Sequence, residues 1–94
     1  MSTPILNHLV ATIAERKANP TPESYTASLF AAGIGKIAQK VGEEGVEVVV
    51  ASLSQSDERL VSEMADLLYH SLVLLAVRDV AWADVEAELA RRFR

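Results

Sequence analysis

Two acidic motifs placed symmetrically about a polar turn constrain the fold of this chain more than any other feature. The first motif is EEGVE at residues 43–47, the second is EMAD at residues 63–66, and the turn between them is SQS at residues 54–56. Gln55 is the centre of the turn. The inner acids, Glu47 and Glu63, are each eight residues from it, and the outer acids, Glu44 and Asp66, are each eleven residues from it. If both flanks are helical and fold back as a hairpin, a rise of about 1.5 Å per residue places the acids at matching heights, roughly 12 to 17 Å from the turn. The spacing therefore predicts a hairpin that brings carboxylates together.

Helical periodicity accounts for the remainder of the chain. Apolar residues recur at helical spacing from Ile5 to Ile13, and the breaker NPTP at residues 19–22 ends that helix. The expected helices are a first one capped by Ser2 or Thr3, a short one from Ser24 or Thr26 through Phe30, a long one from about Ile34, one capped by Ser56 that ends at Arg78-Asp79, and a final one from Trp82 to Phe93. A strand at Val46 to Val50 is a weak alternative. These elements predict a single all-α domain over residues 1–94, a helical bundle of about four to five helices around the central antiparallel hairpin.

The second hairpin helix also predicts self-association. Its polar stripe is narrow, and apolar side chains from Leu60 to Leu75 cover most of its circumference. A helix that is apolar nearly all round is buried on several sides. One chain of 94 residues offers too few helices to surround it. We therefore expect dimerisation to complete the bundle, as a homodimer or a higher homo-oligomer.

Composition excludes several classes of function. The net charge of −4 argues against a nucleic-acid-binding surface, and the absence of cysteine removes disulfides and thiolate chemistry. Met1 to Lys17 lacks the basic start and apolar centre of a signal peptide. The apolar run from Met64 to Val77 is too short to span a bilayer and contains Asp66 and His70. We expect a cytoplasmic protein that binds neither nucleic acid nor membrane.

The acidic residues can be interpreted either as a solvated helix surface or as a functional site. Charges three and four residues apart on a helix are usually solvated surface, and Lys40 could pair with Glu43 or Glu44 there. The second motif changes this balance, because Glu63 and Asp66 lie on a helix too apolar to expose much of its surface. Two carboxylates about 5 Å apart repel by roughly 3 kcal/mol at an effective dielectric constant near 20. Five of them in one cleft need raised pKa values, basic partners or a metal ion.

Oxygen ligands favour a hard divalent cation. Mg²⁺ and Mn²⁺ suit an all-carboxylate site, and Mg²⁺ often leaves positions for substrate phosphates. A zinc site is disfavoured without cysteine, and a di-iron bundle would require Glu-x-x-His where this chain has Glu63-x-x-Asp66. Lys36 and Lys40 lie one turn apart beside the acids and could contact phosphate oxygens.

Two further polar side chains near the motifs have open roles. His70 lies one turn beyond Asp66, and a hydrogen-bonded interior histidine is at least as good an interpretation as a ligand or an acid–base group, so His70 is left out of the metal set. Tyr25 is interpreted as a packing residue, although its loop could flank the site.

The motifs resemble those of one known family. They extend beyond the acids, and read Ser24-Tyr25-Thr26, Lys36-Ile37-x-Gln39-Lys40-Val41-Gly42-Glu43-Glu44-x-x-Glu47 and Glu63-x-x-Asp66-Leu67-Leu68-Tyr69-His70. In this pattern the chain is similar to the phosphoribosyl-ATP pyrophosphohydrolases over roughly residues 5–92. The two acidic motifs also mark the wider superfamily of all-α nucleotide pyrophosphohydrolases.

The resemblance implies an activity and roles for the motif residues. The family catalyses the second step of histidine biosynthesis, the hydrolysis of phosphoribosyl-ATP to phosphoribosyl-AMP and pyrophosphate. It depends on Mg²⁺, with Mn²⁺ as a possible substitute, and forms helical homodimers. By motif, the metal ligands would be Glu44, Glu47, Glu63 and Asp66, and the catalytic residues Glu43, Glu44 and Glu47, with Glu43 a ligand or an aid to the attacking water. Lys36 and Lys40 would bind the triphosphate.

Some points of this resemblance stay open. The chain ends at Arg94, which implies the stand-alone form and not a fusion to the enzyme of the following step. Gly45 occupies a position where alanine is more usual, so close packing is expected to favour it, since glycine inside a helix costs about 1 kcal/mol. The alternatives are a pyrophosphohydrolase of free nucleoside triphosphates and a non-catalytic helical dimerisation module that binds a metal.

Overall fold

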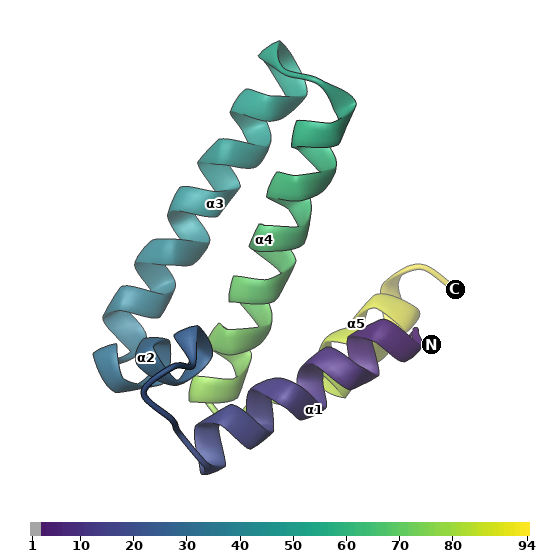
Figure 1. Cartoon of the computed structure of the whole chain (residues 1–94). Coiled ribbons are helices and arrows are strands. Elements are labelled where there is room, and N and C mark those ends of the chain that lie inside the picture. Colours follow the sequence, from purple (N-terminus) through teal and green to yellow (C-terminus); the bar gives the residue numbers. More distant parts are fainter. Residues whose placement is uncertain (1–2) are drawn as a thin grey trace.

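Five α-helices make up the fold in the computed structural model, which describes residues 3–94 (Figure 1). The helices are α1 (Pro4–Ala18), α2 (Tyr25–Ala32), α3 (Ile34–Ser54), α4 (Asp57–Val77) and α5 (Trp82–Arg92). The prediction of an all-α fold with four to five helices is confirmed. The alternative of a strand at Val46 to Val50 is wrong, because these residues lie inside the α-helix α3.

Short polar residues form the N-caps of three of the helices. The hydroxyl oxygens of Thr3, Ser24 and Ser56 accept hydrogen bonds from the backbone N–H groups of the first turns of α1, α2 and α4. Ser24 and Ser56 are thus the predicted caps, while Ser2, the alternative to Thr3, lies outside the described residues. Tyr25 is the first residue of α2, so its expected place in a loop is wrong.

Gly33 makes the abrupt change of direction between α2 and α3. It is both the C-cap of α2 and the N-cap of α3, and its φ angle is 96°. Glycine adopts this left-handed region at little cost, whereas a side chain there is strained. The turn directs α3 away from α2, and α2 then lies across the lower end of the hairpin (Figure 1).

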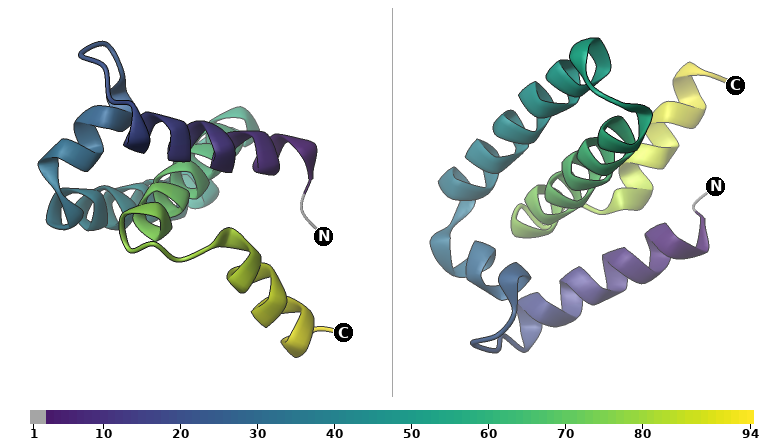
Figure 2. Two further views of the ribbon diagram at one scale, coloured as in Figure 1. Left: turned by 90° about the horizontal axis from the view of Figure 1, so that it is seen from below. Right: turned by 45° about the horizontal axis from the view of Figure 1, so that its top comes forward.

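The helices α3 and α4 form the predicted antiparallel hairpin. Each has 21 residues, and Gln55 and Ser56 alone connect them. The two helices run side by side from the connection to the opposite end, where α1 and α2 lie (Figures 1 and 2). The connection is short, so the pairing of residues across the hairpin follows directly from their distance to the turn.

The hydrophobic core lies at the end of the hairpin far from this turn. Its buried members come from α1, α2, α3 and α4 and are Ile13, Leu29, Ile37, Leu72 and Val73. Towards the turn, no further helix of the described chain covers α3 and α4, and Leu53 and Val61 are 82% and 70% exposed. The expectation that α4 is buried on several sides therefore holds only for its second half, because one chain supplies covering helices only there.

α5 extends away from the hairpin after a bend at residues 78–81 (Figure 2). None of its residues is buried, although Trp82 packs against the edge of the core. The bend itself is held by Lys17 at the end of α1, whose ammonium donates to the Ala76 carbonyl oxygen at 2.7 Å and to the Asp79 carboxylate at 2.8 Å. By length and composition α4 could cross a membrane, but it carries the buried Glu63 and His70 and contributes to the core.

Candidate active site

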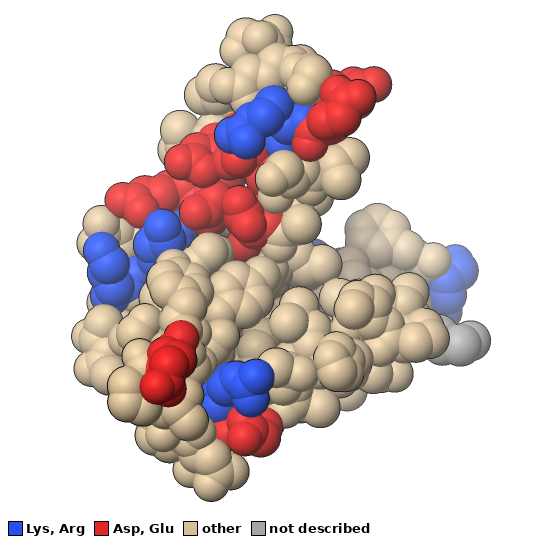
Figure 3. Space-filling view, viewed as in Figure 1, with Lys and Arg blue, Asp and Glu red and all other residues tan. Residues whose placement is uncertain are grey.

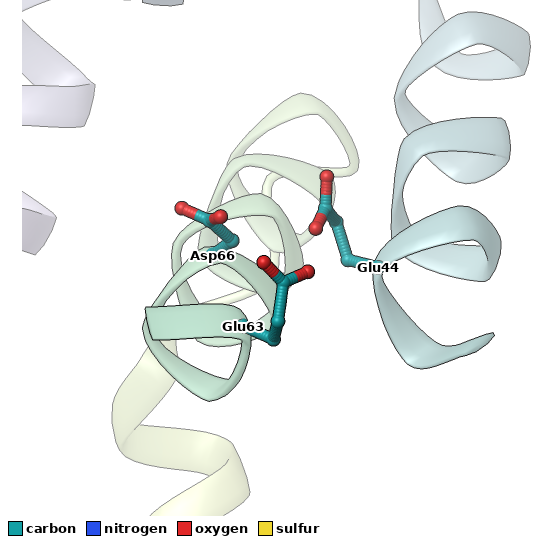
Figure 4. Close-up of side chains that lie close together, drawn as sticks. All are labelled: Glu44, Glu63 and Asp66. Atoms are coloured by element: carbon teal, nitrogen blue, oxygen red, sulfur yellow. The ribbon is translucent and has the colours of Figure 1, made fainter. Parts of the chain in front are cut away.

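The hairpin brings three of the predicted carboxylates into one cluster. Glu44 projects from α3 towards α4, where Glu63 and Asp66 lie one turn apart (Figure 4). One carboxylate oxygen of each residue lies within 4.8 Å of those of the other two. The register predicted from the distances to the turn is confirmed by this geometry, since Glu44 and Asp66 are equally far from the centre of the connection.

Two members of the cluster are buried, and each has one carboxylate oxygen that receives no hydrogen bond from the described residues. Glu44 and Glu63 are only 6% and 5% exposed, and the Oε2 atom of each has no hydrogen-bond partner among the described residues. A buried carboxylate oxygen without a donor or cation is costly. Asp66 is exposed, so the expectation that both acids of the second motif are buried is wrong for Asp66.

Glu47 lies in contact with the two buried acids, and the pKa values of all three reflect this. Burial raises the pKa of Glu44, and hydrogen bonding to Glu47 raises it further. A hydrogen bond to Glu47, followed by burial, likewise raises the pKa of Glu63. The same contacts with Glu63 and Glu44 lower the pKa of Glu47. Carboxyl groups can hydrogen-bond to each other only through a shared proton, so the cluster needs a proton or a cation.

Glu43 occupies a different position from the cluster. Its Oε2 accepts a hydrogen bond from the Gln39 side chain at 3.0 Å, and its Oε1 lies 3.8 Å from the Lys40 ammonium. Half of its side chain is exposed. Its described contacts are thus with residues of its own helix, whereas Glu44 points across the cleft.

Basic side chains flank the acidic patch at both ends (Figure 3). Lys40 lies 3.6 Å from Glu44 Oε1, and the Arg59 guanidinium donates to Glu63 Oε1 at 2.9 Å. Both are pairs of residues four apart on one helix. Lys36 is exposed one turn before Lys40 and forms no ion pair with the described carboxylates. Each buried acid therefore has one basic neighbour at Oε1, whereas its Oε2 receives no hydrogen bond from a donor among the described residues.

A hydrogen-bonded chain joins α2 to the end of the acidic cleft. The Tyr25 hydroxyl lies 3.1 Å from Nε2 of His70, and Nδ1 of His70 lies 2.8 Å from the Asp66 carbonyl oxygen. That carbonyl can only accept, so Nδ1 carries the proton and Nε2 accepts from Tyr25. His70 is buried, and both of its ring nitrogens have a hydrogen-bond partner. This is the hydrogen-bonded interior histidine that the sequence analysis gave as one interpretation. Thr26 and Tyr69 form a second hydrogen bond between α2 and α4.

The donor set fits a hard divalent cation. The cluster offers carboxylate oxygens only, two of which are buried and unpartnered, and its open side at Asp66 leaves room for water or a phosphate. Glu44, Glu63 and Asp66 could hold such an ion, and Glu47 is close enough to Glu44 and Glu63 to take part. A cation there would replace the proton that the buried acids otherwise need.

Two contacts of the site were not predicted from the sequence. The sequence motifs assign no role to Arg59, although its spacing of four residues from Glu63 is the signal that could have found the ion pair. The bond between Tyr25 and His70 joins residues 45 positions apart, and no local pattern reports it.

The fold and this site define the class of the protein, an all-α protein with an acidic cluster between two antiparallel helices. A family model described as phosphoribosyl-ATP pyrophosphohydrolase matches residues 6–93. The chain belongs to the phosphoribosyl-ATP pyrophosphohydrolase family, as its motifs indicated.

Curated relatives are similar in sequence to nearly the whole chain. A phosphoribosyl-ATP pyrophosphatase of Paramagnetospirillum magneticum is 59% identical over 94% of this chain and 81% of its own length. The corresponding protein of Novosphingobium aromaticivorans is 56% identical over 94% of this chain and 82% of its own length. That of Pyrobaculum calidifontis is 50% identical over the full length of both chains.

Proposed function

We propose that this chain hydrolyses phosphoribosyl-ATP to phosphoribosyl-AMP and pyrophosphate, the second step of histidine biosynthesis, with Mg²⁺ as its cofactor. Family membership supports the substrate. The observation that carries the metal-assisted reaction is the pair of buried, unpartnered oxygens of Glu44 and Glu63, which face the same cleft as Asp66. Mn²⁺ would serve as a substitute, because both ions prefer oxygen ligands.

The proposed metal ligands are Glu44, Glu47, Glu63 and Asp66. When bound, the ion would neutralise phosphate charge and lower the pKa of a coordinated water. Glu44 and Glu63 supply rigid, buried oxygens, and Asp66 supplies an exposed one at the mouth of the cleft. Glu47 bridges the two buried acids and keeps its carboxylate ionised at lower pH than its neighbours.

The remaining motif residues are assigned to water and phosphate. Glu43 is half exposed and held by Gln39, so we assign it to orienting the attacking water and not to the metal. Lys40 borders the cluster and Lys36 extends the positive charge by one turn, so both would contact the triphosphate. None of these steps requires a covalent nucleophile.

The active form is proposed to be a homodimer or higher homo-oligomer in the cytoplasm. The half of the hairpin near the turn exposes a set of large apolar side chains: Val46, Val49, Val50, Leu53, Val61 and Met64. Leu89 on α5 and Phe93 directly after this helix are exposed as well. Apolar surface of this extent on an isolated chain is typical of an interface.

A substrate assay tests this function. Purified protein is incubated with phosphoribosyl-ATP, ATP, dATP and dUTP, each with Mg²⁺ and with EDTA, and pyrophosphate release is measured. The expected result is Mg²⁺-dependent release from phosphoribosyl-ATP in large preference to the free nucleotides. Preference for a free nucleoside triphosphate would instead make the chain a general pyrophosphohydrolase. Metal binding without any turnover would make it a non-catalytic module.

A further inference from the structure

A small cavity adjoins the acidic cluster on the side of the α3–α4 connection. It measures about 200 Å³ and is lined by Glu47, Val50, Gln55, Arg59 and Glu63. Two of these residues belong to the proposed metal site, so the cavity opens directly onto it. Arg59 and Gln55 are its hydrogen-bond donors, and neither residue belongs to the acidic motifs.

Arg59 is suited to bind an anion in this cavity. Its side chain is 58% exposed, and the structure gives its guanidinium one hydrogen bond to a described side chain, at Glu63 Oε1. A guanidinium has five N–H donors, so most of them remain available for a ligand. A divalent cation on the four proposed carboxylate ligands would reduce the charge of the acidic cluster from −4 to −2, which lowers the repulsion that an anion meets beside Arg59. The cavity is therefore less repulsive to an anion when the metal site is filled.

The opposite end of the cleft has a different character. Because the two helices are antiparallel, Lys40 lies one turn from Glu44 towards α2, while Arg59 lies one turn from Glu63 towards the connection. Burial lowers the pKa of Lys40, but charge interactions with Tyr25, Glu44 and Glu43 outweigh this and raise it. Tyr25 is 52% exposed, and its hydroxyl is anchored by His70. An exposed, anchored aromatic ring suits a nucleoside base, which a cavity of about 200 Å³ lined by charges does not.

We propose that the pyrophosphoryl group of the substrate binds in the cavity at the α3–α4 connection with Arg59 as its ligand, so that the nucleoside points towards Tyr25. The proposal rests on the proposed function, because it assigns a direction to that substrate in the cleft. Arg59 then has two partners in turn. It holds Glu63 Oε1 in the metal-free protein, and it binds the phosphoryl oxygens once the cation has taken the carboxylates.

Direct binding measurements test the proposal. Calorimetry with inorganic pyrophosphate and, separately, with AMP, each in Mg²⁺, compares the wild type with Arg59→Gln, Arg59→Lys and the control Arg78→Gln, which removes an exposed arginine at the far end of α4. Arg59→Gln is expected to weaken pyrophosphate binding about ten- to a hundredfold, the worth of hydrogen bonds to a charged group. AMP binding is expected to change less than about twofold, because Tyr25 and Lys40 hold the nucleotide. Arg59→Lys should fall between the wild type and Arg59→Gln, and Arg78→Gln should match the wild type.

A second readout separates this role from a merely structural one. Mn²⁺ binding without pyrophosphate is measured by electron paramagnetic resonance, and Arg59→Gln is expected to bind Mn²⁺ at least as tightly as the wild type, since Glu63 Oε1 is released. Unchanged pyrophosphate binding in Arg59→Gln, a larger loss for AMP than for pyrophosphate, or weakened Mn²⁺ binding each overturns the proposal. Arg59-dependent pyrophosphate binding in a protein that does not hydrolyse phosphoribosyl-ATP would support the cavity while rejecting the proposed function.

Discussion

Glu44 on α3 and Glu63 on α4 each bury one carboxylate oxygen, Oε2, that has no hydrogen-bond partner among the described residues, and the two side chains belong to one cluster between the helices. Their other oxygens face Lys40 and Arg59. The protein thus keeps two buried acids half satisfied, at a cost in stability. Such a cost is typical of a site arranged for a ligand.

Glu47→Gln should abolish turnover while leaving the helical fold intact. Glu47 bridges the two buried acids, so its amide would remove one ligand charge and disturb the geometry of the others. We expect turnover with Mg²⁺ to fall by about a hundredfold or more. Mutating residues that only hydrogen-bond to metal ligands already lowers activity by up to about a hundredfold, and Glu47 is itself a proposed ligand. Circular dichroism should remain that of the wild type. Near-normal activity would remove Glu47 from the site, and the exposed Glu58→Gln on the same hairpin is the matched control.

Neutralising a buried acid should stabilise the metal-free protein and remove its response to metal. In Glu44→Gln, an uncharged side chain replaces a carboxylate that has an unpartnered oxygen. Thermal unfolding in EDTA should occur at a higher temperature than for the wild type. Mg²⁺ at a hundred times its dissociation constant should stabilise the wild type by about 2.7 kcal/mol and the variant much less. A variant that responds to Mg²⁺ as the wild type does would contradict the assignment of Glu44 as a ligand.

The stability of the metal-free protein should fall as pH rises above the ordinary carboxyl range. The pKa values of Glu44 and Glu63 are raised above 4.5, so between that value and their folded-state pKa values the folded protein holds more protons than the unfolded chain. Their protonation therefore favours folding at mildly acidic pH, and this contribution is lost as pH rises through the raised pKa values. Glu47 acts oppositely, since its lowered pKa favours folding above the ordinary value and loses that effect in acid.

Denaturant unfolding in EDTA from pH 5 to pH 8 measures this dependence. The double variant Glu44→Gln/Glu63→Gln should show a flatter profile, because its buried groups do not titrate. Saturating Mg²⁺ should flatten the wild-type profile as well, since the cation takes the place of the shared protons. A wild-type profile as flat as that of the double variant would contradict the pKa shifts of these two acids.

Gly45→Ala should stabilise the isolated chain. A Cβ atom at Gly45 would meet nothing within 4 Å, so the close packing expected there is not present within the described chain. Alanine in a helix interior is favoured over glycine by about 0.5–1 kcal/mol. Denaturant unfolding should show that gain with unchanged turnover. A loss of stability that depends on protein concentration would show instead that a second copy packs closely against Gly45.

Local sequence determined the helices and the register of the hairpin. Ser24 and Ser56 cap their helices through side-chain oxygens that act within three residues, and Gly33 bends the chain through its own φ angle. The matching heights of Glu44 and Asp66 follow from a connection of two residues and a constant helical rise. These features could be predicted because each depends on interactions within one helix or one short turn.

Tertiary structure alone decided the environment of each acid. Glu63 is buried and Asp66 is exposed although they lie one turn apart on the same helix, because α3 covers one side of α4 and leaves the other open. The contact between Tyr25 and His70 depends on the docking of α2 against α4. Solvation and charge–charge energies depend on which surfaces meet in space, and the spacing of residues in one chain does not contain that information. The acidic hairpin was thus a property of the sequence, and the unsatisfied pair of Glu44 and Glu63 is a property of the fold.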